Sequence, residues 1–520
     1  MILGNPARHP QQVPPANRVT VDDLFRRTVQ RRPDAIALAD PPNRVSFTDS
    51  PAIRLTYAEA DRMVSAIAGR LRRLGLATDS IIGIQLPNTV ENVLTLLGVL
   101  RAGMIAAPLP LLWRRSDAIT ALTRLGAKML ITAGRIGSVP HGELAMQVAA
   151  EIFPIRFVAG FGTKLPDGMI PLDDLYAVEK LDPLPPMERE RMLNPAAHVA
   201  VITWDVTAEG LVPVARNHME LIAGGIAVAF EGRFAQDAAI LACPTMTSFA
   251  GLALTVLPWL IVGGTLALHH PFDAQAFAAQ CKDERCDTVI VPGPLVPRLV
   301  EANLLDPRTG IKTVAAMWRS PERSAGSPAW RSTTMGLMDV LVFGETCLLP
   351  ARRGPNGRPG LIGFGPLTAP RGTQGAAIVA EVVRTEAGTV ALRGPMVPRH
   401  PYPTGVERSG VPYFNIEPNG LVDTGYTCRV DRDTKAMIVT GPPAGMASVG
   451  GYRFVLSELQ EMVGRVDASG TLGALPDALA GQRLAGKATD VEVVQAALAK
   501  LGVNPLIVGA FRDRRGLPAA

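Results

Sequence analysis

The sequence predicts an α/β fold with a large N-terminal domain over residues 1–440 and a small α+β C-terminal domain over residues 441–520. Three observations carry this prediction. Short apolar runs alternate with helical segments as far as Leu341, which is typical of parallel sheets with crossover helices. Short Gly- and Pro-rich segments follow and indicate a small β-rich subdomain. A Gly-Pro break after Thr440 then opens a final module. The 520 residues exceed what one compact core usually holds, so at least two domains are expected.

The elements follow in order along the chain. After a Pro-rich arm over residues 1–20, a helix is expected over 21–31 and a strand over 35–40. A helix begins near Thr56, where Glu59 completes a capping box, and ends at Gly75. Strand, helix and strand are expected over 81–86, 91–101 and 104–109. Further buried strands are expected over 127–132, 198–203, 238–243, 265–270, 287–293 and 312–317. In the final module, 452–463 and 491–502 are predicted as helices and 506–511 as a strand.

One apolar segment allows two interpretations. Residues 249–268 carry no charge and are long enough to span a bilayer. Pro258 and the Gly263-Gly264 pair interrupt the segment, however. A helix, a turn and a strand buried in the α/β core would have the same composition. We favour the buried interpretation and therefore expect no membrane span.

Composition narrows the classes of function. The chain is 47% hydrophobic and 19% charged, with a formal net charge of +5, and the basic residues are spread along it. Binding to nucleic acid is therefore not expected. Five irregularly spaced cysteines fit a reducing compartment better than a disulfide framework, and the N-terminal residues lack an apolar signal-peptide core. We expect a cytoplasmic protein. The lone Cys281/Cys286 pair is a weak indication of zinc.

Several segments resemble those of one family in their residues and in their order along the chain. These are residues 54–75, 81–110, 391–395, 419–426 and 439–460. Together they resemble the acyl- and aryl-CoA synthetases, which are AMP-forming ligases of the ANL superfamily, over roughly residues 20 to 510. The resemblance implies a mobile C-terminal domain and a two-step reaction. A carboxylic acid would attack ATP to give an acyl adenylate, and CoA would then displace AMP. ATP, Mg²⁺ and CoA would be the cofactors, and a fatty or aromatic carboxylic acid or its acyl-CoA the small-molecule partner.

The family's phosphate loop aligns with residues 204–215. Only Thr207 and Gly210 keep the chemistry that a phosphate needs, because Asp205 and Glu209 would repel a triphosphate and Pro213 lacks a backbone donor. The alternative is a polar surface loop.

The other nucleotide contacts are altered as well. At the adenine- and metal-binding element, Phe343, Gly344 and Thr346 match the family, but the metal-binding glutamate is replaced by Cys347. A thiol is a poor ligand for Mg²⁺. Glu345 could hold the metal only if metal or backbone shifted, since on a strand it would lie roughly 7 Å away.

At the position of the family's ribose-binding aspartate this chain has Tyr426. Pro442 and Ala444 occupy the family's hinge between the two domains. The catalytic lysine has no counterpart in the tail, which offers only Arg512, Arg514 and Arg515. No catalytic residue is therefore assigned. Lys487 is interpreted as a surface lysine and not as the missing catalytic lysine. For Phe343, the alternative to stacking on adenine is a place in the hydrophobic core.

The best-preserved landmark is the loop Gly450, Gly451, Tyr452 and Arg453, which by resemblance lies beside the pantetheine tunnel. The alternative interpretation of these residues is a tight turn before a helix, with no role in binding. By the same resemblance Thr247 and Phe249 line an acyl pocket.

Two hypotheses follow: a divergent working ligase, or a catalytically silent pseudo-ligase that binds an acyl group, acyl-CoA or a partner protein. A homodimer is possible under both. The joint loss of nucleotide contacts makes adenylation doubtful.

Overall fold

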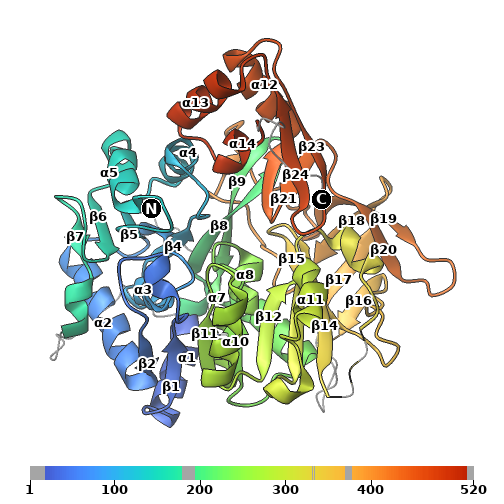
Figure 1. The fold of residues 1–520 in the computed structure, drawn as a ribbon, viewed down its shortest axis with the longest axis horizontal. Helices are drawn as coiled ribbons and strands as arrows, with labels where there is room; N and C mark the ends of the chain where they lie inside the picture. The colour runs from blue at the N-terminus through green and yellow to red at the C-terminus, as the bar shows by residue number, and fades with distance from the viewer. Residues whose placement is uncertain (1–17, 178–193, 331, 333, 369–377, 512–520) are drawn as a thin grey trace.

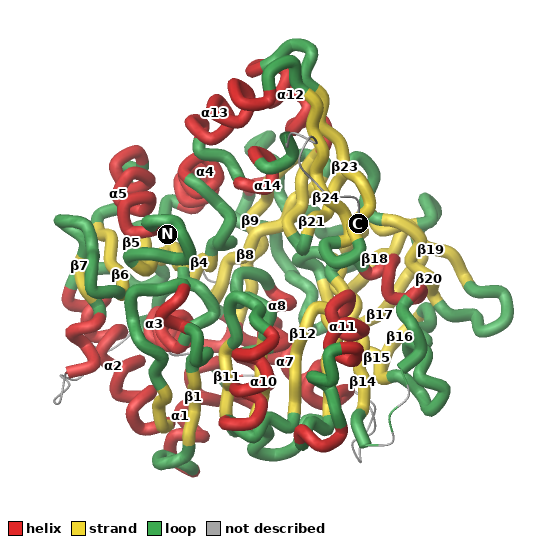
Figure 2. The backbone as a smooth tube through the Cα atoms, in the orientation of Figure 1, coloured by secondary structure: helices red, strands yellow, loops and turns green. Residues whose placement is uncertain are grey.

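Two large sheets form the body of the molecule (Figures 1 and 2). The computed structural model describes residues 18–177, 194–330, 332, 334–368 and 378–511. The first sheet has seven strands, which are, in spatial order, β7 (Ile170–Pro171), β6 (Phe157–Phe161), β5 (Met129–Ala133), β3 (Ile81–Gln85), β4 (Ile105–Pro108), β8 (Val199–Thr207) and β9 (Gly210–Asn217). Neighbouring strands are parallel except for the antiparallel pair β8–β9.

The second sheet has eight strands and a parallel centre. In spatial order they are β15 (Cys347–Arg352), β14 (Gly336–Phe343), β13 (Thr313–Trp318), β12 (Thr288–Pro292), β10 (Ala239–Ala242), β11 (Thr265–Leu268), β1 (Ile36–Ala39) and β2 (Arg54–Thr56). Only the two edge pairs, β14–β15 and β1–β2, are antiparallel. The parallel strands are buried, as expected of sheets covered on both faces.

Helices fill three layers around these sheets. The main core lies between the sheets and includes α1 (Val21–Arg31), α2 (Tyr57–Arg73), α3 (Val90–Arg101), α7 (His218–Gly232), α8 (Phe249–Leu254) and α9 (Val256–Val262). The outer face of the first sheet is covered by α4 (Arg115–Leu125) and α5 (His141–Glu151), and that of the second by α10 (Ala274–Asp283) and α11 (Val296–Glu301). The predicted capping box is confirmed at α2, where Thr56 and Glu59 cap each other's backbone amides.

The uncharged segment 249–268 lies inside this core. It forms α8, α9 and β11, and its side chains are largely buried. Among the described residues, no helix has the length and apolar character that a bilayer crossing requires.

Two smaller sheets complete the chain. The Gly- and Pro-rich region forms a five-stranded antiparallel sheet of β16 (Gly365–Thr368), β17 (Ile378–Arg384), β18 (Thr389–Arg393), β19 (Val422–Val430) and β20 (Met437–Gly441). The last sheet consists of β22 (Tyr452–Val455), β21 (Met446–Val449), β24 (Gly481–Lys487) and β23 (Thr471–Asp477). Together with α12 (Leu456–Val466), α13 (Val491–Leu501) and α14 (Pro505–Val508) it has its own hydrophobic core. We call residues 446–511 the C-terminal module.

The structure corrects two predictions in this module. Residues 506–511 do not form a strand; α14 begins here because the Asn504 side chain accepts the amide of Leu506 and Pro505 occupies the first turn. The predicted helix over 452–463 begins only at Leu456, because Tyr452–Val455 pair with β21. The domain boundary at residues 440/441 stays a prediction.

Candidate functional site

The segment expected to be a phosphate loop is a tight β-hairpin. Thr207 pairs with Gly210, so only Ala208 and Glu209 form the turn. The prediction of a surface loop is therefore wrong here. Along the hairpin, backbone amides are used in the strand ladder and do not converge on one point, as a phosphate cradle requires. Thr207 donates its hydroxyl hydrogen bond to Glu209 at 2.8 Å.

We call the C-terminal module and the part of the chain before it the two lobes. Asp205 faces inward from this hairpin and forms an ion pair across the interface between the lobes. Its Oδ1 accepts a hydrogen bond from Nη1 of Arg453 at 2.7 Å, and its Oδ2 accepts one from the amide of Glu345 at 2.9 Å. Arg453 also donates from Nη2 to the hydroxyl of Tyr426 at 2.7 Å. Burial lowers the pKa of Arg453, but Asp205 and Tyr426 together raise it above its usual value. We call Asp205, Tyr426 and Arg453 the latch.

The Phe343–Cys347 segment is a turn between two strands. Phe343 ends β14 and pairs with Cys347, the first residue of β15, so Glu345 lies in the turn. Glu345 and Cys347 therefore do not share a strand, and the spacing of roughly 7 Å that a strand would impose does not apply. Burial raises the pKa of the Cys347 thiol to about 12, which keeps it neutral and unsuited to Mg²⁺.

The Glu345 carboxylate is already occupied by protein donors. Its Oε2 accepts hydrogen bonds from the Thr203 hydroxyl at 2.6 Å and from the Phe249 amide at 2.8 Å, and Arg216 Nη1 lies 3.7 Å away. Burial raises the pKa of this carboxyl, and Arg216 opposes the shift. Arg216 also donates to the carbonyl oxygens of Glu345 and Thr346. In the described part of the chain, no three His, Cys, Asp or Glu side chains are grouped so that they could hold a metal ion.

The two aromatic residues of the expected nucleotide site pack on each other. The ring centroids of Phe343 and Tyr426 are 5.5 Å apart with an interplanar angle of 87°, and both side chains are fully buried. Burial raises the pKa of Tyr426. Nearby, Trp204 packs on Trp113, and Trp318 Nε1 donates to Asp339 at 2.7 Å. The edge of one of the two rings, Phe343 or Tyr426, therefore lies against the face of the other.

Gly344 lies at the centre of the site. Its φ of +56° is a left-handed conformation, and a Cβ added there would lie 2.5 Å from Asp205 Oδ2 and 2.6 Å from Arg453 Nη1. The residue is therefore required by both the turn and the latch.

The Gly450–Arg453 loop brings the C-terminal module to the hairpin. Gly450 and Gly451 form the turn between β21 and β22, with φ values of +59° and +97°. Tyr452 accepts a hydrogen bond from the Leu112 amide at 3.2 Å through its hydroxyl. The tight turn expected as the alternative is present, and it places Tyr452 and Arg453 against the N-terminal part of the chain.

A cavity of about 250 Å³ lies around the latch between the two lobes. We call it the latch cavity. Its lining includes Trp113, Asp117, Trp204, Asp205, Arg319, Gly344, Glu345, Gly451, Tyr452, Arg453 and Glu458. Of the predicted site it unites Gly344, Glu345, Gly451, Tyr452 and Arg453. The predicted residues outside its lining are Thr207, Gly210, Phe343, Thr346, Tyr426 and Gly450.

The residues predicted for the acyl pocket lie at the start of α8. Thr247 shares a hydrogen bond with the Thr245 hydroxyl, and Phe249 is fully buried with its ring 3.9 Å from the Arg216 guanidinium. Neither lines the latch cavity. Sequence reasoning missed Arg216 and Arg319; a charged residue inside or directly after an apolar strand was the available signal.

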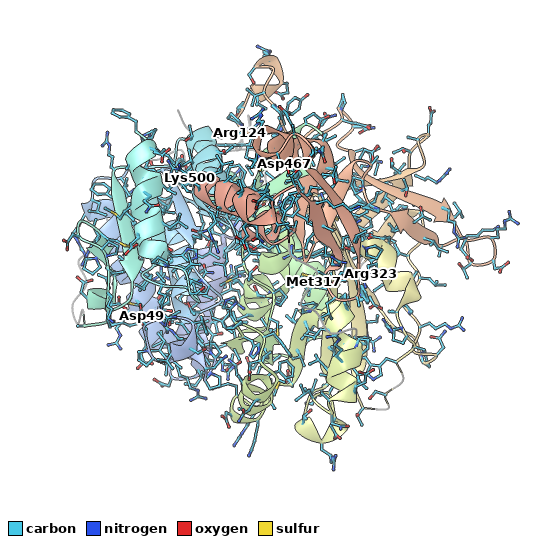
Figure 3. The ribbon with its side chains drawn as sticks, turned by 45° about the horizontal axis from the view of Figure 1, so that its top comes forward. Asp49, Arg124, Met317, Arg323, Asp467 and Lys500 are labelled. Atoms are coloured by element: carbon cyan, nitrogen blue, oxygen red, sulfur yellow. The ribbon has the colours of Figure 1, made fainter. Side chains whose placement is uncertain are left out.

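The remaining predicted positions are distant or not described. Lys487 ends β24 and Lys500 lies on α13, and both are exposed (Figure 3 labels Lys500). Arg512, Arg514 and Arg515 lie outside the described residues. Pro442 follows β20 at the junction to the module.

The family is decided by a match to the model of the AMP-binding enzyme family, which covers residues 25–342, more than half of the chain. The chain belongs to the AMP-binding enzyme family. The ANL-type fold extends over nearly all of it. The amide bond synthetase McbA from Marinactinospora thermotolerans superposes with a TM-score of 0.70 at 16% identity, covering 94% of each chain. A Mycobacterium tuberculosis fatty acyl CoA synthetase superposes with a TM-score of 0.62 at 16% identity, covering 92% of this chain and 91% of the other.

Curated relatives in sequence match shorter regions. The long-chain fatty acid transport protein 1 of Bos taurus is 25% identical over 290 residues, which cover 55% of this chain and 42% of that protein. The cyclosporin synthetase simA of Tolypocladium inflatum is 30% identical over 134 residues, covering 26% of this chain and 1% of that protein. The matched region thus spans less than half the length of these relatives. Proteins similar to this chain thus include a fatty acid transport protein and a cyclosporin synthetase in sequence and a fatty acyl CoA synthetase in fold.

Proposed function

We propose that this AMP-binding family protein binds an acyl or aryl group as its CoA thioester without converting ATP to an adenylate. The observation that carries the proposal is the Asp205–Arg453 ion pair, which spans the lobes at the place where the family's phosphate loop aligns. An internal carboxylate satisfies the cation there, so a triphosphate would have to displace Asp205 and approach its negative charge.

Mg²⁺ and ATP do not fit the residues present. Two of the carboxylates that line the latch cavity, those of Asp205 and Glu345, are held by protein donors, and Arg216 and Arg453 lie beside them. Mg²⁺ needs free oxygen ligands in octahedral geometry. The hairpin has no set of converging backbone amides. The proposed function therefore contains no adenylation step.

Binding of an acyl-CoA draws its support from the parts of the site that remain. In the Gly450–Gly451 turn, Arg319 packs on Gly451, but the space beside Gly450 is open, so a thin ligand arm can approach the backbone there. The relatives include a fatty acid transport protein and a fatty acyl CoA synthetase. All five cysteines are free, as this proposal of a cytoplasmic acyl-CoA binder expects.

An ATP–pyrophosphate exchange assay over a panel of fatty and aromatic acids tests the proposal, together with calorimetric titrations of ATP-Mg²⁺ and of acyl-CoA thioesters. We expect no exchange above background, no ATP binding, and micromolar binding of at least one thioester. Arg308→Ala is the control variant, because Arg308 is exposed and pairs only with the adjacent Asp306 among the described residues. Robust exchange would instead establish the second candidate, a divergent working ligase, and overturn the proposal.

A further inference from the structure

A pocket of about 700 Å³ lies at the end of the second sheet that faces away from the latch cavity. Its lining comes from the C-terminal end of α7, the residues before β13 and β14, and the end of β15 with the residues after it. We call it the distal pocket. Gly336, which lines it, begins β14, whereas Gly344 of the latch cavity directly follows the last residue of that strand. The two glycines are therefore about 25 Å apart along β14. Figure 1 shows the C-terminal module beyond the opposite end of this strand.

Two exposed cations of the distal pocket are available to a ligand. They are Arg233, which directly follows α7, and Lys312, which precedes β13. Among the described residues, the Arg233 guanidinium has no hydrogen-bond or ion-pair partner. Lys312 interacts electrostatically with Asp287, which lies outside the lining. Both side chains can therefore turn toward an anion without breaking a hydrogen bond within the described part of the chain.

Arg352 is a third cation, and it is anchored between the other two. Its Nη1 donates to the Gly232 carbonyl at 2.9 Å, next to Arg233. Its Nη2 lies over Gly336, 2.2 Å from the position that a Cβ would take, and the Gly336 amide donates to the Lys312 carbonyl at 2.8 Å. Burial lowers the pKa of Arg352, and the nearby Arg233 guanidinium lowers it further. Like charges thus repel each other in this pocket.

The carboxylates around the distal pocket do not neutralise these three cations. Glu231 lines the pocket, but its Oε1 accepts the backbone amide of Arg352 at 2.9 Å. A fourth cation, Arg353, is fully engaged: it pairs with Asp339 at 2.7 Å and donates to the Pro328 carbonyl at 2.7 Å. Three cations against one carboxylate leave an excess of positive charge, which an anionic ligand would relieve.

Aromatic side chains lie beside the cations. Trp330 is half-buried, packs against the core on the outer face of the sheet, and lines the pocket together with Met335 and Leu337. One helical turn before Arg233, the side chain of Phe230 on α7 is 56% exposed. Cations next to partly exposed aromatic rings are complementary to a ligand that carries both carboxylates and large apolar groups. An acidic peptide segment has this composition.

The shape of the pocket favours a peptide over a membrane surface. Arg352 is half-buried and lines a hollow, where the flat surface of a bilayer would not reach it. The cations come from three separate elements around Gly336, so carboxylates spaced along one chain can contact them together. The hollow has room for several side chains of such a segment.

We propose that the distal pocket docks an acidic segment of a partner protein, in which two or more carboxylates contact Arg233, Lys312 and Arg352 and a large apolar side chain covers Trp330. The proposal goes beyond the acyl-CoA binding proposed above, because the distal pocket and the latch cavity share no lining residue among those described.

Fluorescence polarisation of labelled peptides with the full chain tests the inference. The probe is fluorescein-labelled Glu-Glu-Phe-Glu-Glu, and its matched peptides are Gln-Gln-Phe-Gln-Gln and Glu-Glu-Ser-Glu-Glu. We expect the probe to bind at least about tenfold more tightly than the Gln peptide, because charge-assisted hydrogen bonds to the cations are lost with the carboxylates. The Ser peptide should bind more weakly than the probe, since it leaves Trp330 uncovered.

A double variant shows where the probe binds. Arg233→Gln combined with Lys312→Gln should weaken probe binding at least about tenfold, whereas Arg233→Lys should retain most of it. The matched control is Arg308→Gln combined with Arg465→Gln, which removes two exposed cations elsewhere and changes the net charge equally. The control should bind the probe as the wild type does. Melting temperatures of both double variants show that the fold is retained.

Equal weakening in the two double variants would mean that binding follows net charge alone, and it would overturn the inference. Equal binding of the Glu and Gln peptides would do the same. Displacement of the probe by citrate at an equal concentration would assign the pocket to a small polyanion instead. Binding to phosphatidylserine vesicles without peptide binding would assign it to a membrane surface; both results contradict the proposal. Acyl-CoA binding is titrated in the same double variant, and it should persist there, so a failure of peptide docking leaves the proposed function standing.

Discussion

Asp205 and Arg453 form an ion pair in which the side chains are 7% and 13% exposed. Such a pair contributes little net stability, because the desolvation of both charges offsets their attraction. Breaking it is costly, since the partner is left as an unpaired buried charge. The Tyr426 hydroxyl and the Glu345 amide satisfy the remaining bonds of the pair. The sequence marks Asp205 as incompatible with phosphate, but only the fold supplies its partner, 248 residues away.

Removing the Arg453 guanidinium tests whether the ion pair leaves a costly unpaired charge when it is broken. Arg453→Met should lower the free energy of unfolding by about 3–5 kcal/mol, because Asp205 then stays buried and unpaired. Adding Asp205→Asn should recover part of the loss. Urea denaturation measures both. The control is Arg465→Met in the same module, which removes only an exposed pair with Glu461 and should cost less than about 0.5 kcal/mol. A similar cost for Arg453→Met and Arg465→Met would contradict the latch.

Gly344 gives a second prediction at the residue scale. Gly344→Ala should destabilise the protein by more than the about 1–2 kcal/mol of left-handed strain, because the new methyl group also meets Asp205 and Arg453. Gly445→Ala is the matched control: its φ is +72°, but nothing lies within 4 Å of the added Cβ. Thermal unfolding of both variants measures the difference. Equal destabilisation would show that Gly344 serves the turn alone.

At the scale of elements, α4 presents its N-terminus to the latch cavity. Asp117 accepts the Arg114 amide there at 3.0 Å and lines the cavity. Burial raises the pKa of Asp117 to about 6, and the Arg114 amide and guanidinium oppose the shift. A carboxyl whose pKa is higher in the folded state than in the unfolded chain holds its proton more tightly when folded. Its ionisation therefore reduces stability as the pH rises from about 4 to about 6.

Asp117→Asn should flatten that pH dependence. Between pH 4 and pH 6.5 the wild-type protein is expected to lose about 1–3 kcal/mol through Asp117, which the neutral amide would not lose. Other buried carboxyls, such as Asp40 with a pKa of about 7, contribute to both proteins alike. Urea midpoints along a pH series measure the effect, with the exposed Asp34→Asn as control. Parallel curves for Asp117→Asn and wild type would refute it.

The elements also show where sequence patterns suffice. The capping box at Thr56 and the apolar parallel strands were predicted correctly, because both signals are local. The β8–β9 hairpin was missed because its turn, Ala208-Glu209, lacks the usual Gly or Asn of a two-residue turn. The helix α14 was missed because a short apolar run fits a strand equally well.

At the scale of the whole molecule, several contacts fix one arrangement of the lobes. Besides the latch, the Ser116 amide donates to the Gly502 carbonyl at 2.9 Å, and Arg323 donates to Ala478. The C-terminal module lies over the ends of both large sheets, next to the hairpin (Figure 1). A two-step ligase needs this module to rotate. The latch opposes rotation, because separation would leave Asp205 without its cation.

Energy transfer between probes on the two lobes should therefore be insensitive to nucleotide. Cysteines introduced by Phe153→Cys and Val493→Cys provide labelling sites, since these side chains are 100% and 59% exposed. We expect no change in transfer efficiency with ATP-Mg²⁺ and an acid. Adding Arg453→Met should broaden the distance distribution. A nucleotide-dependent change in the protein with an intact latch would refute a fixed arrangement.

The sequence by itself determined the class of fold and the order of most elements, because these follow from local periodicity. Residue types at aligned positions predict, in addition, that the family's nucleotide-binding residues are lost. Only the tertiary structure decided what replaced the lost contacts. Asp205, Glu345, Tyr426 and Arg453 lie in four separate segments, and their meeting depends on how the lobes dock. The latch cavity is likewise a property of the packing between the two lobes. Periodicity along one segment carries no information about such packing.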